Sequence, residues 1–331
     1  MNAPTAAVAR PATREPTGGS DGGTLPSPPA RLWALIGLGL AGGPLYLAAY
    51  RPADLPASPL TFTIIFATLC ALYAVACRLV LRDPARLPHR HALLVIVAVA
   101  LLYRAVFLPA TPWLSDDFYR YVWDGHIQNE GYSPWQLPPG AAALAPLRDD
   151  TYWPRINRKE QTSAYPPLAE LVFRALALAR PFSMAPFKLA FFLADLLTIG
   201  MIGELLRRRG HSPLGLIVYA WHPLPPFEFL HSAHVDVLAV TFLVLALVLQ
   251  ARGRPAAAGV ALGLATLTKL YPGLLLPAFS RRGDWRLPLG CVGTVVAGLA
   301  PALLSGATNF RQLPTYLLEE GYSSGDRFFP L

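Results

Sequence analysis

Long apolar segments dominate the chain and determine its predicted architecture. They fall at residues 32–50, 59–81, 91–108, 184–205, 213–230, 235–250, 256–279 and 287–305. A helix that spans a bilayer needs about 20 mainly apolar residues, and most of these segments reach or approach that length. The pattern predicts an all-α membrane protein, a polytopic transmembrane helix bundle of about eight to ten spans or half-spans.

One further stretch, at residues 166–181, is apolar on a single helical face. Leucine, valine and alanine recur there at helical spacing, whereas Glu170 and Arg174 share the opposite face at i,i+4 spacing. The stretch is short for a span. We therefore predict an interfacial amphipathic helix that lies on the outer surface of the membrane.

The segment at 256–279 contains helix breakers near its middle. Pro272 and Gly273 follow Lys269 in the stretch "TKLYPG". Residues of this kind interrupt transmembrane helices where the backbone is buried in protein or lines a cavity. We expect two half-helices that form a hairpin, so that both ends of the segment lie on the same side.

Arginines cluster between the apolar segments and indicate the orientation of the chain. Cytoplasmic loops are enriched in Lys and Arg, which assigns to the cytoplasm the clusters Arg78–Arg82–Arg86–Arg90, Arg207–Arg208–Arg209, Arg252–Arg254 and Arg281–Arg282–Arg286. Residues 1–30, rich in Pro, Gly, Ser and Thr, are expected to form a disordered cytoplasmic tail. Residues 31–331 form the transmembrane domain in the plasma (inner) membrane. Within it, 109–183 are an outer, periplasmic loop with the surface helix, and 306–331 are an outer C-terminal segment.

Composition supports this class and argues against others. The chain is 53% hydrophobic and only 15% charged, against about 25% charged residues in soluble proteins. The topology-marking arginines account for the net charge of +8, and the sequence contains no nucleic-acid-binding motif. Its three cysteines lie within apolar segments, which indicates neither a disulfide framework nor a CxxC metal site.

The outer loop concentrates acids and aromatic rings in the stretch "SDDFYRYVWDG". Asp116 and Asp117 are neighbours, so their charges repel and one carboxylate is suited to act as a general base. Two alternatives are a divalent cation held by both carboxylates and a helix N-cap. Rings that stack on sugar C–H faces beside acids that bind hydroxyls suggest a sugar site, with candidate residues Tyr119, Arg120, Trp123, Asp124 and, from "AYPPL", Tyr165.

Two other stretches carry polar groups within apolar surroundings. The stretch "EFLHSAHVD" supplies Glu228, His231, His234 and Asp236 as substrate-binding candidates, and its H-x-x-H-x-D spacing leaves zinc as an alternative. Lys269 lies inside an apolar segment, where an ammonium group is costly and is usually functional. A phosphate is its natural partner, and Arg104 and His234 can serve the same anion. Snorkelling to the interface is the structural alternative for Arg104 and Lys269.

The order and spacing of several stretches resemble a known superfamily. They are "SDDFYRYVWDG", "YSPW", "AYPPLAEL", "FFLADLLTIG", "YAWHPLPPFEFLHSAHVDVLAV", "LGLATLTKLYP" and "EEGYSSGDRFF". With them, the chain resembles the GT-C integral-membrane glycosyltransferases, and most of all the bacterial mannosyltransferase-like proteins of glycosyltransferase family 87. The resemblance implies a GT-C type fold, a polyprenyl-phosphate sugar as donor and a glycan, lipid or protein acceptor.

The chain also departs from the superfamily in two respects. Eukaryotic mannosyltransferases of this superfamily carry Asp-x-Asp in the first outer loop. Asp116 matches the first acid, but Phe118 stands in place of the second. The resemblance therefore favours Asp116 as the main acid. Superfamily members usually have further membrane segments after the last outer loop, which leads us to expect a truncated or split relative here.

These observations predict an inverting hexosyltransferase that moves a hexose, expected to be mannose, on the outer face. Asp116 would take the proton of the acceptor hydroxyl, and Lys269, His234 and Arg104 would bind the donor phosphate. The sequence carries no P-loop or Rossmann signature for a nucleotide. The alternatives are a transporter or flippase for a lipid-linked sugar, a metal-dependent membrane hydrolase and a non-catalytic relative.

Overall fold

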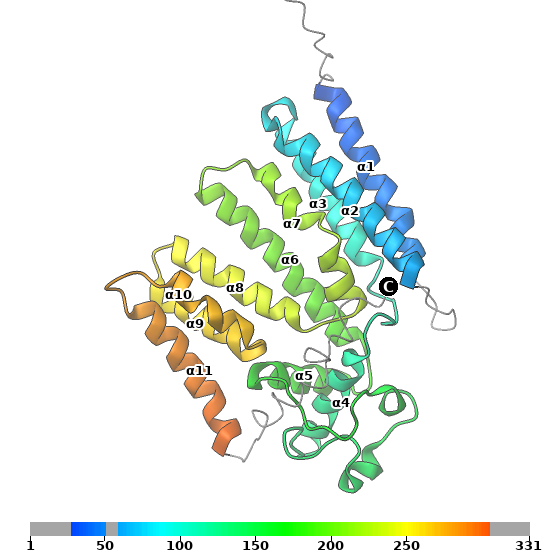
Figure 1. Ribbon diagram of the computed structural model, residues 1–331, viewed down its shortest axis with the longest axis vertical. Helices are drawn as coiled ribbons and strands as arrows, with labels where there is room; N and C mark the ends of the chain where they lie inside the picture. The colour runs from blue at the N-terminus through cyan, green and yellow to red at the C-terminus, as the bar shows by residue number, and fades with distance from the viewer. Residues whose placement is uncertain (1–27, 51–58, 305–331) are drawn as a thin grey trace, which may run out of the picture.

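The computed structural model describes residues 28–50 and 59–304, and the regular secondary structure of these residues is helical (Figure 1). The described part contains no β-strand, only an isolated bridge between Arg281 and Asp284. The expected tail lies outside the described residues up to residue 27, and residues 28–30 already belong to the first helix. The expected outer segment at 306–331 also lies outside the described residues.

Within the described residues, four helices are long and apolar enough to cross a membrane: α1 (Pro28–Ala49), α2 (Pro59–Leu81), α6 (Ala185–Arg208) and α11 (Arg286–Leu304). Two apolar helices are shorter, namely α8 (Asp236–Ala251) and α9 (Pro255–Thr268). Helix α3 (His89–Ala105) follows α2 after the short 3₁₀-helix η1 (Pro84–Arg86). The predicted class, an all-α multi-pass membrane protein, is confirmed.

The segment at 213–230 does not form the single span that the hydrophobic pattern predicted. It comprises the 3₁₀-helix η4 (Pro213–Leu216), the short α7 (Ile217–Ala220) and the π-helix η5 (Pro226–His231). Pro223, Pro225 and Pro226 have no amide hydrogen to donate, so a regular helix cannot continue through them. The prediction of one continuous helix there is wrong for this reason.

The hairpin predicted at 256–279 is confirmed. Helix α9 ends at Thr268, and the chain turns back through the 3₁₀-helix η6 (Tyr271–Leu275) into α10 (Leu276–Phe279). The side-chain amide of Gln250, in the last turn of α8, donates to the carbonyl oxygen of Phe279 at 2.8 Å. Since α9 begins just after α8 ends, this contact shows that the segment returns to the level from which it started.

The expected outer loop contains two helices that lie together at one end of the molecule (Figure 1). Helix α4 (Asp117–Asn129) was not predicted, and α5 (Pro167–Ala179) corresponds to the predicted surface helix. Two 3₁₀-helices lie between them, η2 (Ala142–Leu147) and η3 (Trp153–Arg155). On α5 the predicted polar face is only partly exposed, because Glu170 is fully buried against α4. Leu171 and Leu178 are exposed instead.

The basic clusters gather at the other end of the bundle. The guanidinium of Arg31 donates to the carbonyl of Asp83 at 3.3 Å, which joins the start of α1 to the α2–α3 connection. The carboxylate of Glu204 pairs with three arginines from the ends of α6 and α8: Arg207, Arg208 and Arg252. These connections lie opposite α4 and α5 in Figure 1.

The part of the bundle that the structure describes has two apolar cores. The larger joins α1 to α7 and the start of α8, whereas the smaller joins α8, α9, α10 and α11. Helices α9 and α11 approach closely at Gly259, where a Cβ atom would collide with the carbonyl oxygen of Leu287. Small residues permit this kind of approach between membrane helices.

Candidate functional site

The site begins at the N-terminus of α4, where the acidic pair stands. Asp116 occupies the N-cap position, and Asp117 is the first residue of the helix. A helix N-terminus stabilises nearby negative charge through its unpaired amide groups. However, the side chain of Asp116 does not cap the helix. Its carboxylate is exposed and faces another segment of the outer loop.

That segment contributes Asn157, which sequence reasoning missed. The side-chain nitrogen of Asn157 donates to Oδ1 of Asp116 at 2.6 Å and to Oδ1 of Asp117 at 3.1 Å. One neutral amide therefore bridges two adjacent carboxylates. Asn157 lies some forty positions further along, in "RINRKE", where no hydrophobic period or motif surrounds it. Only the folded loop reveals this contact.

The stretch before α8 supplies a histidine close to the same pair. Nδ1 of His234 contacts Oε2 of Glu228 at 2.6 Å. Burial lowers the pKa of His234, but the hydrogen bond to Glu228 and the negative charges of Glu228, Asp117 and Asp236 outweigh it, so the pKa is raised overall. Nε2 of His234 is buried and has no hydrogen-bond partner among the described residues. A protonated His234 therefore has one N–H that remains available to an anion.

Lys269 reaches the same end of the bundle from the turn after α9. Its ammonium group lies 3.2 Å from Oδ2 of Asp236 and 5.7 Å from the ring centre of Tyr165. The side chain of Lys269 is 30% exposed, so this charge remains within reach of a ligand. The broken hairpin explains its position, because the helix stops at the residue before Lys269.

Tyr121 links the acidic pair to this cation. It lies one turn beyond Asp117 on α4, and its hydroxyl is 3.5 Å from that of Tyr165. Burial, followed by the charge of Asp117, raises the pKa of Tyr121 well above its usual value, and Asp236 acts in the same direction. Asp117 and Asp236 thus both act on Tyr121 and on His234. Four segments that are distant in sequence therefore meet in one site.

Other predicted site residues lie inside the fold. Tyr119, Arg120, Trp123 and Asp124 are buried on the inner side of α4. The guanidinium of Arg120 pairs with Asp124 at 2.7 Å, and the hydroxyl of Tyr119 accepts from Arg155 at 3.1 Å.

Arg104 is also buried, and Nε donates to Asp195 at 2.5 Å. The charge of Arg104 is therefore neutralised by a carboxylate between α3 and α6.

The zinc alternative does not fit the arrangement of the histidines. His231 is fully buried among aromatic rings, with ring centroids 5.1 Å from Phe107 and 5.4 Å from Trp113. His234 instead turns to Glu228. Within residues 28–50 and 59–304, no three His, Cys, Asp or Glu side chains converge in a way that could hold a metal ion.

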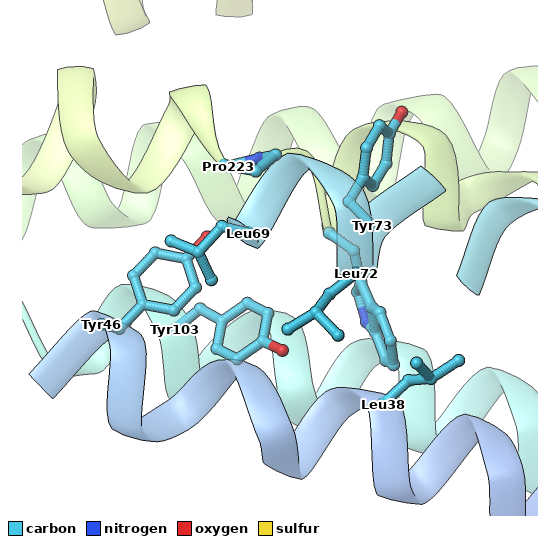
Figure 2. Close-up of a pocket in the computed structure, with 8 residues that line it drawn as sticks. Leu38, Tyr46, Leu69, Leu72, Tyr73, Tyr103 and Pro223 are labelled. Carbon is cyan, nitrogen blue, oxygen red and sulfur yellow. The ribbon is translucent and has the colours of Figure 1, made fainter. Parts of the chain in front are cut away.

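The enclosed apolar pocket of Figure 2 lies elsewhere, between α1, α2, α3 and Pro223. Its volume is only about 10 Å³. The rings of Tyr46, from α1, and Tyr103, from α3, fill it (Figure 2). A wider, almost wholly apolar groove of about 540 Å³ lies between the ends of α2 and α6, next to the arginine clusters. Neither is lined by a carboxylate or by Lys or Arg, so the exposed site at α4 is the stronger candidate.

An all-helical membrane protein with paired carboxylates and two cationic groups at one end of its bundle has the features of a membrane-bound group-transfer enzyme. Comparison with known protein families defines the class more closely. The family described as alpha-(1->6)-mannopyranosyltransferase, N-terminal domain, matches residues 44–281. This is well over half of the chain, which therefore belongs to that family of membrane mannosyltransferases and is a hexosyltransferase. No curated protein and no solved structure matches the chain.

Proposed function

We propose that this protein transfers mannose from a polyprenyl-phosphate donor to an acceptor hydroxyl, with Asp116 as the general base. The observation that supports this most directly is the meeting of an acidic pair with two cationic groups. Asp116 and Asp117 come from α4, His234 precedes α8 and Lys269 follows α9. Acids to activate a hydroxyl and cations to hold a leaving phosphate are what this transfer requires.

The cationic groups are suited to the donor phosphate. Lys269 is partly exposed, and Asp236 is a partner that a phosphate can displace or share. The unpartnered Nε2 of His234 can donate to a phosphate oxygen. Arg104 is not assigned to the phosphate, because Asp195 already neutralises it. Glu228, Asp236 and Tyr165 surround these cations and become candidates for contacts with the sugar.

The reaction requires one proton transfer and one displacement. Asp116 takes the proton of the acceptor hydroxyl while the acceptor oxygen attacks the anomeric carbon from the face opposite the phosphate. The bond between the anomeric carbon and the phosphate oxygen breaks, and the polyprenyl monophosphate leaves with its charge stabilised by Lys269 and His234. This displacement inverts the anomeric centre. An α-linked product, as the family description implies, therefore calls for a β-linked donor.

The proposed location is the outer face of the membrane. The arginine clusters gather at the end of the bundle opposite α4 and α5. If that basic end faces the cytoplasm, the site faces outward. A lipid donor fits this position, because its head group can meet Asp116 at the aqueous edge while its prenyl chain remains in hydrocarbon.

A transfer assay on the purified protein in lipid vesicles tests the proposal. Radiolabelled polyprenyl-phosphate mannose and a synthetic mannoside serve as the substrates. We expect Asp116→Asn to lower kcat by at least about 10²-fold, since a general base contributes that much. Asp150→Asn is the matched control, because Asp150 is an exposed aspartate of the same loop. Full activity of Asp116→Asn, or a product of retained configuration, would exclude this mechanism.

A further inference from the structure

The two carboxylates at the start of α4 need a group that holds them in place. Asp116 and Asp117 are adjacent, and like charges at this separation repel. Asn157 donates to Oδ1 of both, at 2.6 Å and 3.1 Å. The amide nitrogen has two hydrogens, so it can satisfy one carboxylate with each. It fixes the direction in which both carboxylates point.

The backbone around Asn157 is held in place on both sides. The ammonium group of Lys159 donates to the carbonyls of Pro154 and Ile156, at 3.0 Å and 2.9 Å, and lies 5.0 Å from the ring centre of Trp153. The carbonyl of Lys159 accepts from the amide of Gly140 at 2.7 Å. These hydrogen bonds hold the backbone on both sides of Asn157, the residue that carries the bridging amide.

The next residue adopts an unusual backbone conformation. Arg158 has a φ of +46°, in the left-handed region that non-glycine residues rarely adopt. Such conformations persist only where the surrounding structure enforces them, and they are concentrated at functional sites. Here the left-handed residue directly follows Asn157, within the segment that Lys159 closes.

We propose that Asn157 is a positioning residue that orients Asp116 for proton abstraction by bridging it to Asp117. This inference rests on the proposed function, in which Asp116 is the base. In this role Asn157 acts through Asp116 and Asp117 and not on the substrates themselves. It acts by setting the angle at which the carboxylate of Asp116 meets the acceptor hydroxyl, and a misplacement of about 1 Å at such a group costs on the order of 10²-fold in rate.

The side-chain amide of Asn157 would have a different chemical role if its oxygen and nitrogen exchanged places. If the oxygen of Asn157 faced the carboxylates, three acceptors would converge, and only a cation between them would make that arrangement favourable. The two roles respond in opposite ways to Asn157→Asp. A carboxylate cannot replace the amide donor, whereas it is a good ligand for a divalent cation.

The transfer assay described above distinguishes these roles when kcat and KM are measured separately. We expect Asn157→Ala to lower kcat on the order of 10²-fold with little change in the KM for the donor. Asn157→Asp should lose at least as much. Asn129→Ala and Asn129→Asp are the matched controls, because Asn129 ends the same helix and donates only to the carbonyl of Arg174 at 3.2 Å. Both should keep the wild-type kcat at a temperature below the melting transition of every variant, which is measured alongside.

Several outcomes would overturn the inference. A kcat for Asn157→Ala within about twofold of wild type would remove Asn157 from the mechanism, as would equal loss in the Asn129 variants. Retained activity of Asn157→Asp that requires added Mg²⁺ or Mn²⁺ and disappears with a chelator would favour the cation. Failure of the proposed function looks different, because Asp116→Asn would then be fully active or the wild-type protein would transfer no sugar.

Discussion

His234 is a titratable residue of the candidate site, next to three carboxylates that act on it. Its pKa is raised because the bond to Glu228 and the nearby carboxylates of Asp117 and Asp236 outweigh the effect of burial. Histidine is the side chain that ordinarily titrates in this range. The site therefore favours the imidazolium form, which can donate from Nε2 to an anion while Nδ1 contacts Glu228.

The charge on His234 should appear as a pH dependence of stability. A raised pKa means that the folded protein binds this proton more tightly than the unfolded chain. The stabilisation is therefore fully present below the ordinary value of 6.5 and is lost as the pH rises through the raised value. We expect the melting temperature of wild type to exceed that of His234→Gln at low pH, with the difference vanishing at high pH. His211→Gln, at the basic end, is the control, and an equal pH dependence in that variant would contradict the assignment.

At the residue scale, the sequence could predict which side chains are costly to place in an apolar segment. It could not predict which partners they contact in the fold. Lys269 and Arg104 give the same signal, a cation in an apolar segment. The fold separates them, because Arg104 meets Asp195 from α6 and is fully buried, whereas Lys269 stays partly exposed at a helix break. Asn157 gave no signal, since its contacts with the acidic pair arise only when the loop folds back on α4.

At the scale of elements, the contact between α4 and α5 holds the acidic pair in place. It contains a buried polar network beside apolar contacts such as the stacked rings of Tyr121 and Phe173. Arg120 pairs with Asp124, while the hydroxyl of Ser163 and the amide of Gln128 donate to Glu170. Burial, followed by the charge of Asp124, raises the pKa of Glu170 well above its usual value. One cation thus faces two buried carboxyl groups, and the network is balanced when Glu170 carries a proton.

This charge balance predicts that substitutions of Glu170 and of Asp124 change the free energy of unfolding by different amounts. Glu170→Gln keeps a neutral group of the same shape, so we expect a change in unfolding free energy below about 1 kcal/mol at neutral pH. Asp124→Asn removes the carboxylate that is hydrogen-bonded to the buried Arg120 and should cost about 3–5 kcal/mol.

Wild type should also lose stability as the pH rises above 4.5, because the folded protein there holds more protons than the unfolded chain. Denaturant unfolding at several pH values measures both effects. A pH slope that persists unchanged in Glu170→Gln would show that another group carries it.

Elements with a clear hydrophobic pattern or a clear helix breaker were predicted well from the sequence, and the other elements were not. The apolar segment at 59–81 coincides with α2, and the breakers Pro272 and Gly273 marked the hairpin turn. Helix α4 was missed because its mixture of acids and aromatic rings suggests a loop, although its inner face is buried in the fold. The segment at 213–230 was taken for a span because its hydrophobicity conceals three prolines that break it. Tertiary packing decides the first case, and the missing amide hydrogens of the prolines decide the second.

At the scale of the whole molecule, charge is separated between two ends. The arginine clusters near Asp83 and Glu204 lie at one end, and the acidic pair with α4 and α5 lies at the other. Membrane insertion responds to such asymmetry, because basic loops are retained on the cytoplasmic side. The same asymmetry therefore predicts which face of the membrane the site occupies, and with it which pool of donor the proposed reaction uses.

Labelling of single cysteines in intact cells tests this orientation. In a variant without the native Cys70, Cys77 and Cys291, we expect Ala143→Cys to react with a membrane-impermeant thiol reagent added from outside. Arg209→Cys should react only after the membrane is permeabilised. Both positions are exposed in the fold, so a difference between them reports the membrane and not local burial. The opposite labelling pattern would place the acidic pair on the cytoplasmic side and require a donor that presents its head group there. Equal labelling of both positions would show that the basic clusters do not determine the orientation of this bundle.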